Sequence, residues 1–312
     1  MTETAVSGAR RIRFVRPIVA GLLTLAILGV ILRRVPFPAL AAALGEADYR
    51  TFLALMIPNT LFYFGWDTLV LAVVIRWFHG PVSYRDLLPV RASSYVVGFF
   101  NTNLGRGAMA AYLCRRLRAP FLELGSTVIF LVLTEYTQLV LWSMLGLIGF
   151  RAEVTRSLLA VAAAVACFWI VVRIVLAPRR WSIVRTLRLA TVRQYGAIVL
   201  LRSPMFFVSL CLHYYAAHAF GIRIPFVQML TFLPVIFMLA ALPVTVAHLG
   251  TTQAAWIFFF SQYAPAPRLL AFSLAAHLVF ASTRALVGVL WLPVALADLI
   301  PAPLKRGPTA VA

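Results

Sequence analysis

Long apolar runs alternate along the chain with short polar connections that carry most of the arginines. A helix needs about 20 apolar residues to cross the hydrocarbon core of a bilayer, whereas strands of a membrane barrel show about ten residues of alternating polarity. Because these runs do not alternate, we expect helices. The pattern predicts an all-α, polytopic transmembrane bundle with about six full spans, at residues 17–32, 51–78, 122–150, 155–177, 195–220 and 268–300.

Two further stretches, 91–118 and 226–263, each consist of two short apolar arms around a glycine-bearing break. The breaks lie at 101–107, with the sequence NTNLGRG, and at 243–250. At about 1.5 Å per helical residue, the arms of the first stretch fall short of a hydrocarbon core roughly 30 Å thick. We therefore interpret both stretches as re-entrant, broken-helix hairpins. Their irregular backbone has to lie inside protein or against a wet cavity, because unsatisfied backbone groups are costly in lipid.

The distribution of arginines favours hairpins that enter the membrane from opposite sides. The loops 79–89 and 178–193 and both termini then fall on the cytoplasmic side, as the positive-inside rule requires. This arrangement also indicates a possible inverted repeat. A bundle of eight full spans stays open as an alternative, because helix tilt and bilayer thinning accommodate short segments. We expect a disordered start at 1–9, one transmembrane domain at 10–300 and a cytoplasmic tail at 301–312.

Composition and charge agree with a membrane location. Apolar residues make up 62% of the 312 positions and charged residues 12%, with a mean hydropathy of +0.94. The surface of a soluble domain does not tolerate such a composition. The net charge of +19 would suggest nucleic acid in a soluble protein, but in a membrane it fits arginines that face anionic lipid head groups. We expect a bacterial-type cytoplasmic (inner) membrane and no nucleic-acid partner.

The sequence carries no pattern typical of a metal, cofactor or catalytic site. Its three cysteines have no paired spacing, and His213 and His218 lie five apart, on different faces of a helix. Nucleophile elbows and phosphate-cradling glycine motifs are missing from the sequence. We therefore expect no metal, no cofactor and no enzymatic activity.

Four ionisable residues interrupt the apolar runs, namely Asp67, Glu135, Arg202 and Arg284. Such residues suggest a functional site in a membrane protein, and each costs roughly 2.5–3.5 kcal/mol at the bilayer centre, so each needs a partner. We expect Glu135 to pair with Arg202 or Arg284, in either a functional or a structural ion pair. Arg202 lies only seven residues into its span, so it has the alternative of reaching the inner interface.

Three segments together resemble a known family. They read VSYRDLLPVRASSYVVGFFNTNLGRGAMAAYLCRRL, LVLTEYTQLVLWSMLGLIGF and LPVTVAHLGTTQAAWIFFF. They are similar to the transmembrane region of lysylphosphatidylglycerol synthases, the flippase-like integral membrane family, over about residues 35–300. The soluble aminoacyl-transferase domain that some members carry has no counterpart in these 312 residues.

The match is partial at each motif. The asparagine-rich turn is present but lacks the usual proline, Tyr136 replaces an arginine after the glutamate of the next span, and Gln253 replaces a glutamate in the late motif. The residues that we predict to bind a head group are Asn101, Asn103, Gly105, Arg106, Glu135, Arg202, His248, Gly250, Gln253 and Arg284. Capping for the asparagines, snorkelling for Arg106 and packing for Gln253 are the structural alternatives.

The resemblance implies that the protein binds and translocates a phospholipid or a lipid-linked anionic molecule through a polar intramembrane cavity. An anionic phospholipid and a polyprenyl-phosphate-linked molecule are the candidate substrates. Two alternatives stay open: a non-transporting lipid-binding partner of a membrane enzyme, such as a transferase, and a membrane-embedded transferase that acts on a lipid carrier. The oligomeric state is also left open.

Overall fold

The computed structural model describes residues 35–100, 102–147, 181–241 and 250–299, together with positions 29, 30, 33, 156, 159, 160, 163 and 167. All regular secondary structure in these residues is helical, so the predicted all-α class is confirmed. The expected spans at 17–32 and 155–177 lie almost wholly outside the described residues. So do the segments 1–9 and 301–312.

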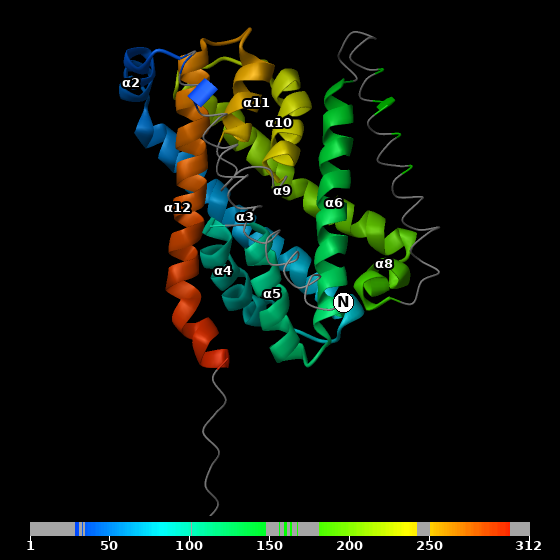
Figure 1. Cartoon of the computed structure of the whole chain (residues 1–312). Helices are drawn as coiled ribbons and strands as arrows, with labels where there is room; N and C mark the ends of the chain where they lie inside the picture. Colours follow the sequence, from blue (N-terminus) through cyan, green and yellow to red (C-terminus); the bar gives the residue numbers. More distant parts are fainter. Residues whose placement is uncertain are drawn as a thin grey trace, which may run out of the picture.

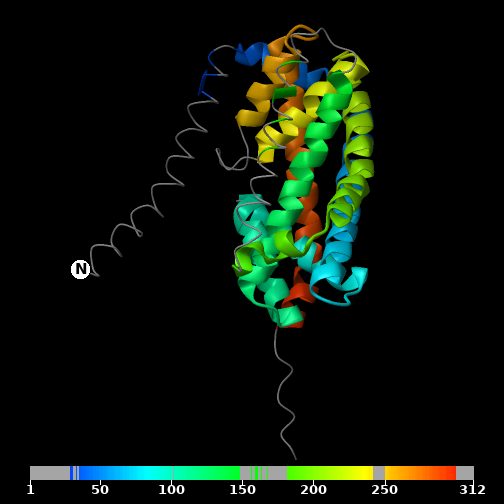
Figure 2. The ribbon, with the colours of Figure 1, turned by 90° about the vertical axis from the view of Figure 1, so that its right-hand side faces the viewer.

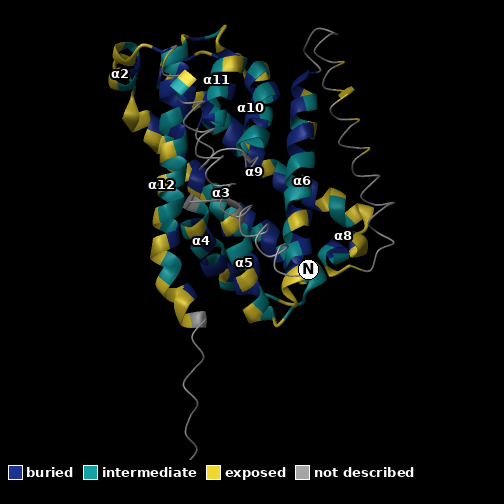
Figure 3. Cartoon of the chain, in the orientation of Figure 1, coloured by how far each residue is buried: buried dark blue, intermediate teal, exposed yellow. Residues whose placement is uncertain are grey.

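Four long helices form the frame of the molecule. They are α3 (Tyr49–Phe78), α6 (Phe121–Leu147), α9 (Val192–His218) and α12 (Ala266–Leu299). Each is long and apolar enough to cross a membrane. Exposed large apolar side chains such as that of Leu200 lie on the outer surface, where contact with lipid is more favourable than contact with water. Figure 3 shows exposed residues along the long helices. The chain is therefore a helical membrane protein by the length and composition of its helices.

Two pairs of shorter helices lie at opposite ends of this frame. The first pair, α4 (Tyr84–Phe100) and α5 (Thr102–Leu117), packs at the lower end in Figures 1 and 2, where α3 ends. The second pair, α10 (Phe226–Ala241) and α11 (Thr251–Phe260), packs at the upper end. Each pair reaches only part of the way along the long helices.

The break in the first pair is much shorter than expected. The segment 101–107 was predicted to be a polar turn, but α5 begins at Thr102, so Gly105 and Arg106 belong to a helix. Gly105 serves close packing instead. A Cβ atom there would lie 2.7 Å from the Cα atom of Gly98 and 2.7 Å from the carbonyl oxygen of Ser94. The glycine lets α4 and α5 touch, which keeps both arms helical.

Short helices cover the two ends of the frame. At the upper end, α2 (Phe37–Gly45) buries Leu40 and exposes Phe37. At the lower end, the turn η2 (Ser182–Val184) and helix α8 (Arg185–Leu189) pack against α6.

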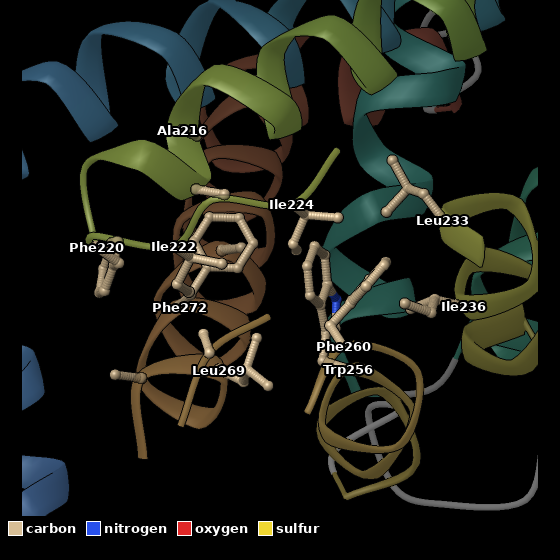
Figure 4. Packing of buried hydrophobic residues seen from close by; sticks show 14 of the residues in the cluster. Ala216, Phe220, Ile222, Ile224, Leu233, Ile236, Trp256, Phe260, Leu269 and Phe272 are labelled. Carbon is tan, nitrogen blue, oxygen red and sulfur yellow. The ribbon is translucent and has the colours of Figure 1, made fainter. Parts of the chain in front are cut away.

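Two apolar clusters fill the interior. The upper cluster is rich in aromatic rings, and Figure 4 shows Phe220, Trp256, Phe260 and Phe272 packed together. The lower cluster joins the second half of α3 to α4, α5 and the first part of α6. The space between the two clusters is therefore the part of the interior that is left for polar groups.

Candidate functional site

A polar layer separates the two apolar clusters. On α3 the upper cluster includes Met56 and the lower one begins at Val70, and Asp67 lies between them. On the other long helices the same gap contains Glu135, Arg202 or Arg284. All four ionisable residues that interrupt the apolar runs therefore fall between the clusters, near the middle of the bundle.

One part of the layer is a loose ion pair between α5 and α6. The Nη2 atom of Arg106 lies 3.6 Å from the Oε2 atom of Glu135. The hydroxyl of Tyr63, on α3, donates to Oε1 of the same carboxylate at 3.4 Å. Both charged side chains keep about a fifth of their surface exposed, at 22% and 23%. The structure thus brings two predicted site residues, Arg106 and Glu135, together.

The other part of the layer is centred on Asp67. This carboxylate forms ion pairs with Arg91 of α4 and with Arg202 of α9, the latter at 3.4 Å between Oδ1 and Nη1. The Asp67 side chain is 7% exposed and that of Arg202 is 3% exposed. The contact with Arg202 lacks hydrogen-bond geometry, so its Nε and Nη1 atoms have no hydrogen-bond partner in the described part of the chain. One buried carboxylate is therefore shared by two arginines, and its charge neutralises only one of them.

The third arginine of this group is Arg284, which forms no ion pair with a carboxylate in the described part of the chain. The guanidinium of Arg284 lies 3.7 Å from the centre of the Tyr95 ring and 5.0 Å from that of Phe280. Arg91 lies over the same tyrosine at 5.1 Å. A guanidinium over an aromatic face gains a cation–π attraction but no neutralising charge. We call Asp67, Arg91, Arg202, Arg284 and Tyr95 the arginine node.

Close helix packing places Arg284 on Tyr95. Gly288 lies one turn after Arg284 and faces α4, where an added Cβ atom would lie 2.8 Å from the carbonyl oxygen of Ala92 and 2.7 Å from Val96 Cγ2. Residues four apart share a helix face, so the close approach at Gly288 also brings Arg284 toward α4. The close packing at Gly288 therefore helps to place Arg284 over Tyr95.

The ion pairs differ from those expected. The expected partner of Glu135 was Arg202 or Arg284, but its ion-pair partner among the described residues is Arg106. Arg202 does not reach an interface, because it is 2% exposed and paired with Asp67. Pairing depends on how each helix is rotated, and apolar run length carries no information on rotation.

The second break gives a different result. Gly250 has a φ of +92°, a left-handed conformation that favours glycine, and its N–H donates to Oε1 of Gln253 at 2.7 Å. Gln253 is fully buried, so its described role is to cap the start of α11. Asn101 and His248 lie outside the described residues, as does the side chain of Asn103.

Sequence reasoning missed Arg91, Tyr95 and Tyr63. The sequence analysis began the first short-armed stretch at residue 91, whereas α4 begins at Tyr84 and holds Arg91 two turns inside the helix. The segment beginning at Ser83 reads Ser-Tyr-Arg-Asp, a serine followed three residues later by an acid, which is a helix-start signal. It would have placed Arg91 and Tyr95 four residues apart on one helix face.

The chain matches no protein-family model and no curated protein. The resemblance to the flippase-like family therefore stays a prediction, and the functional argument depends on the geometry of the polar layer. Within the described residues, no group of three or more His, Cys, Asp or Glu residues could hold a metal ion. The chemistry that these residues offer is charge recognition by arginine.

Proposed function

We propose that the protein is a flippase-like integral membrane protein that binds and translocates an anionic phospholipid or a polyprenyl-phosphate-linked molecule. The observation that carries this proposal is the polar layer, where four arginines meet two carboxylates between two apolar clusters. An excess of arginine in a water-poor interior attracts anions, and the guanidinium fork suits phosphate oxygens.

The depth of the layer supports a transport role. Asp67 precedes the end of α3 by eleven residues, which places it roughly 16 Å from that end at 1.5 Å per residue. Glu135 lies fourteen residues after the start of α6, roughly 21 Å from its start. Ionisable groups at such depth are costly and mark substrate paths in membrane proteins. A lipid that only rested on the surface would not need them.

The two helix pairs supply a path for the lipid head group. We infer that α4–α5 and α10–α11 are re-entrant hairpins that enter from opposite faces, beside six full spans. The 17 residues of α4 and 16 of α5 reach about 25 Å, short of a hydrocarbon core of about 30 Å. Arg106 is the fifth residue of α5, near a helix N-terminus that itself favours anions. Broken helices of this kind form the midplane sites of transporters that work by alternating access.

Arginines also suggest the orientation of the protein. Arg76, Arg115, Arg116 and Arg188 are exposed and lie in the last turns of α3, α5 and α8. These helices end in the lower half of the bundle in Figure 1. By the positive-inside rule we infer that this end faces the cytoplasm of a bacterial-type cell. The last described helix, α12, also ends there, which favours a cytoplasmic C-terminus.

Transport by this site requires the Arg106–Glu135 pair to open. In the proposed cycle a phosphate replaces Glu135 as the partner of Arg106, and Glu135 keeps the hydroxyl of Tyr63 as its donor. The carboxylate returns to Arg106 once the head group leaves, so the arginine is never without an anion.

The test is lipid movement in proteoliposomes, measured with fluorescent anionic lipids and a quencher that does not cross the membrane. We expect Arg106→Ala and Glu135→Gln to slow movement by about tenfold or more, the effect of losing one charge-assisted hydrogen bond. Arg268→Gln is the matched control, because Arg268 forms an exposed pair with Glu46. Unchanged rates in both site variants would refute the site. If the unmodified protein moves no lipid, the result would favour the alternative of a non-transporting lipid-binding partner of a membrane enzyme.

A further inference from the structure

The two parts of the polar layer carry different charges. Arg106 and Glu135 neutralise each other. The arginine node instead holds three guanidinium groups around one carboxylate, which gives it a formal charge of +2. Uncompensated charge inside a protein of low dielectric is strongly unfavourable, so the node attracts a further anion. The neutral pair has no such requirement.

The node also holds buried donors without acceptors. Among the described residues, Nε of Arg91, Arg202 and Arg284, Nη1 of Arg202 and the hydroxyl of Tyr95 have no hydrogen-bond partner. Arg202 and Tyr95 are 2% and 3% exposed, so water does not readily reach them. Buried polar groups are nearly always satisfied in folded proteins. Five unsatisfied donor atoms in a group with excess positive charge indicate an acceptor with several oxygens.

We propose that the arginine node binds the dianionic phosphate monoester of a lipid. A phosphate monoester carries about −1.5 to −2 charges near neutral pH and offers three acceptor oxygens. Beside Asp67 it brings the formal charge of the node to zero, whereas a phosphodiester leaves one positive charge uncompensated. This inference deepens the proposed function and depends on it for the lipid, but the charge argument applies to any phosphate dianion.

The geometry also shows where the phosphate would approach. Arg91 and Arg284 are half-buried, while Asp67 and Arg202 are enclosed behind them. Among the described residues Arg284 forms no ion pair and lies over aromatic rings, so it can bind an incoming anion without first releasing a carboxylate. Arg91 belongs to α4, which is one arm of the proposed hairpin. Binding of a phosphate at the node would therefore also hold α4 in position.

The experiment compares two lipids with the same acyl chains, phosphatidic acid as the monoester and phosphatidylglycerol as the diester, with phosphatidylcholine as the zwitterionic reference. Binding to the purified full chain in nanodiscs is measured by native mass spectrometry. Arg284→Gln is the informative variant, because it removes a charge without leaving a carboxylate unpaired. Arg268→Gln is the matched control on the same helix, and Arg284→Lys retains the charge. Thermal melting of each variant establishes that it is folded.

We expect the unmodified protein to prefer phosphatidic acid by about tenfold or more, since two charges pair with the node rather than one. Arg284→Gln should abolish the preference, while Arg268→Gln and Arg284→Lys should keep it. Equal binding of both lipids by the unmodified protein, or a preference that survives Arg284→Gln, would overturn the inference.

Two further arms separate this inference from the proposed function. The first arm tests whether inorganic phosphate competes with phosphatidic acid for the node. Competition that depends on Arg284 would assign the node to free phosphate, whereas failure to compete would assign it to a lipid head group. Both outcomes retain a phosphate dianion as the ligand. The transport assay is read separately. Movement of phosphatidylglycerol without any monoester preference overturns only the inference, and preference without movement of any lipid overturns only the transport function.

Discussion

The guanidinium of Arg284 stacks on the ring of Tyr95 at 3.7 Å from the ring centre, and this contact joins α12 to α4. Arg91 also lies over the ring of Tyr95. Among the described residues of the polar layer, this is the one aromatic ring that two arginines share. The ring therefore holds two like charges close together, at the point where the layer has more arginines than carboxylates. A platform of this kind keeps the cations in place when no anion is bound.

The first prediction concerns this platform. Tyr95→Leu should lower the free energy of unfolding by about 0.5–2 kcal/mol through loss of the cation–π contacts, in addition to any packing loss. Tyr95→Phe should leave stability within about 0.5 kcal/mol of the unmodified protein, because the hydroxyl has no described hydrogen-bond partner. Thermal and denaturant unfolding in lipid-free detergent measure both. A large loss in Tyr95→Phe would show that the hydroxyl has a structural acceptor.

The second prediction concerns the buried carboxylate. Asp67→Asn leaves Arg91 and Arg202 without a counter-charge, and breaking a buried ion pair in this way costs about 3–5 kcal/mol. We expect a marked fall in melting temperature. Asp86→Asn is the control, because the Asp86–Arg116 pair lies at the surface and contributes about 0–1 kcal/mol. Equal melting temperatures for the two variants would mean that Asp67 is not needed to balance the node.

The third prediction concerns the crossing of α4 and α5. Gly105→Ala puts a Cβ atom 2.7 Å from backbone atoms of α4, so we expect a loss of about 1–3 kcal/mol from overpacking. Gly98→Ala is a close control, because its Cβ atom would lie 3.8 Å from its nearest neighbour, the Cα atom of Gly105. Chemical unfolding of the two variants measures the difference. If Gly98→Ala is as damaging as Gly105→Ala, the close approach is not the cause.

The long helices were predictable because span length depends on local composition. The ends of α3 and α12, for example, lie within two residues of the expected bounds. A hydrophobic run of sufficient length forms a helix in a membrane whatever it packs against, because no other structure satisfies its backbone. The break after Phe100 was also located correctly, but its extent was not, since the need for Gly105 at a helix crossing cannot be read from the chain alone.

The pairing within the site was not predictable. Asp67, Glu135, Arg202 and Arg284 were identified as costly residues, yet their partners depend on helix rotation and on crossings set by residues such as Gly288. Arg91 and Tyr95 were not predicted to belong to the site. Both lie in the node because α4 begins at Tyr84 and therefore includes them.

The last prediction concerns pH and lies outside the spans. His79 follows α3, and its Nε2 atom lies 2.7 Å from the hydroxyl of Thr127. Burial lowers the pKa of His79 below 6.5, and the nearby charge of Arg185 lowers it further, against the opposing effect of Glu123. The folded protein therefore binds fewer protons at this site than the unfolded chain once the pH falls below about 6.5.

The sign follows from that difference. The stabilising contribution of His79 is fully present above pH about 6.5 and is lost as the pH falls through that value toward the lower pKa of the folded state. We expect the melting temperature to drop between about pH 7.5 and about pH 5.5, and the drop to be smaller in His79→Gln, whose amide can still bond to Thr127. His218→Gln is the control, because His218 is exposed and bonds only to Tyr214 of its own helix turn in the described structure. An unchanged pH dependence in His79→Gln would show that another group titrates in this range.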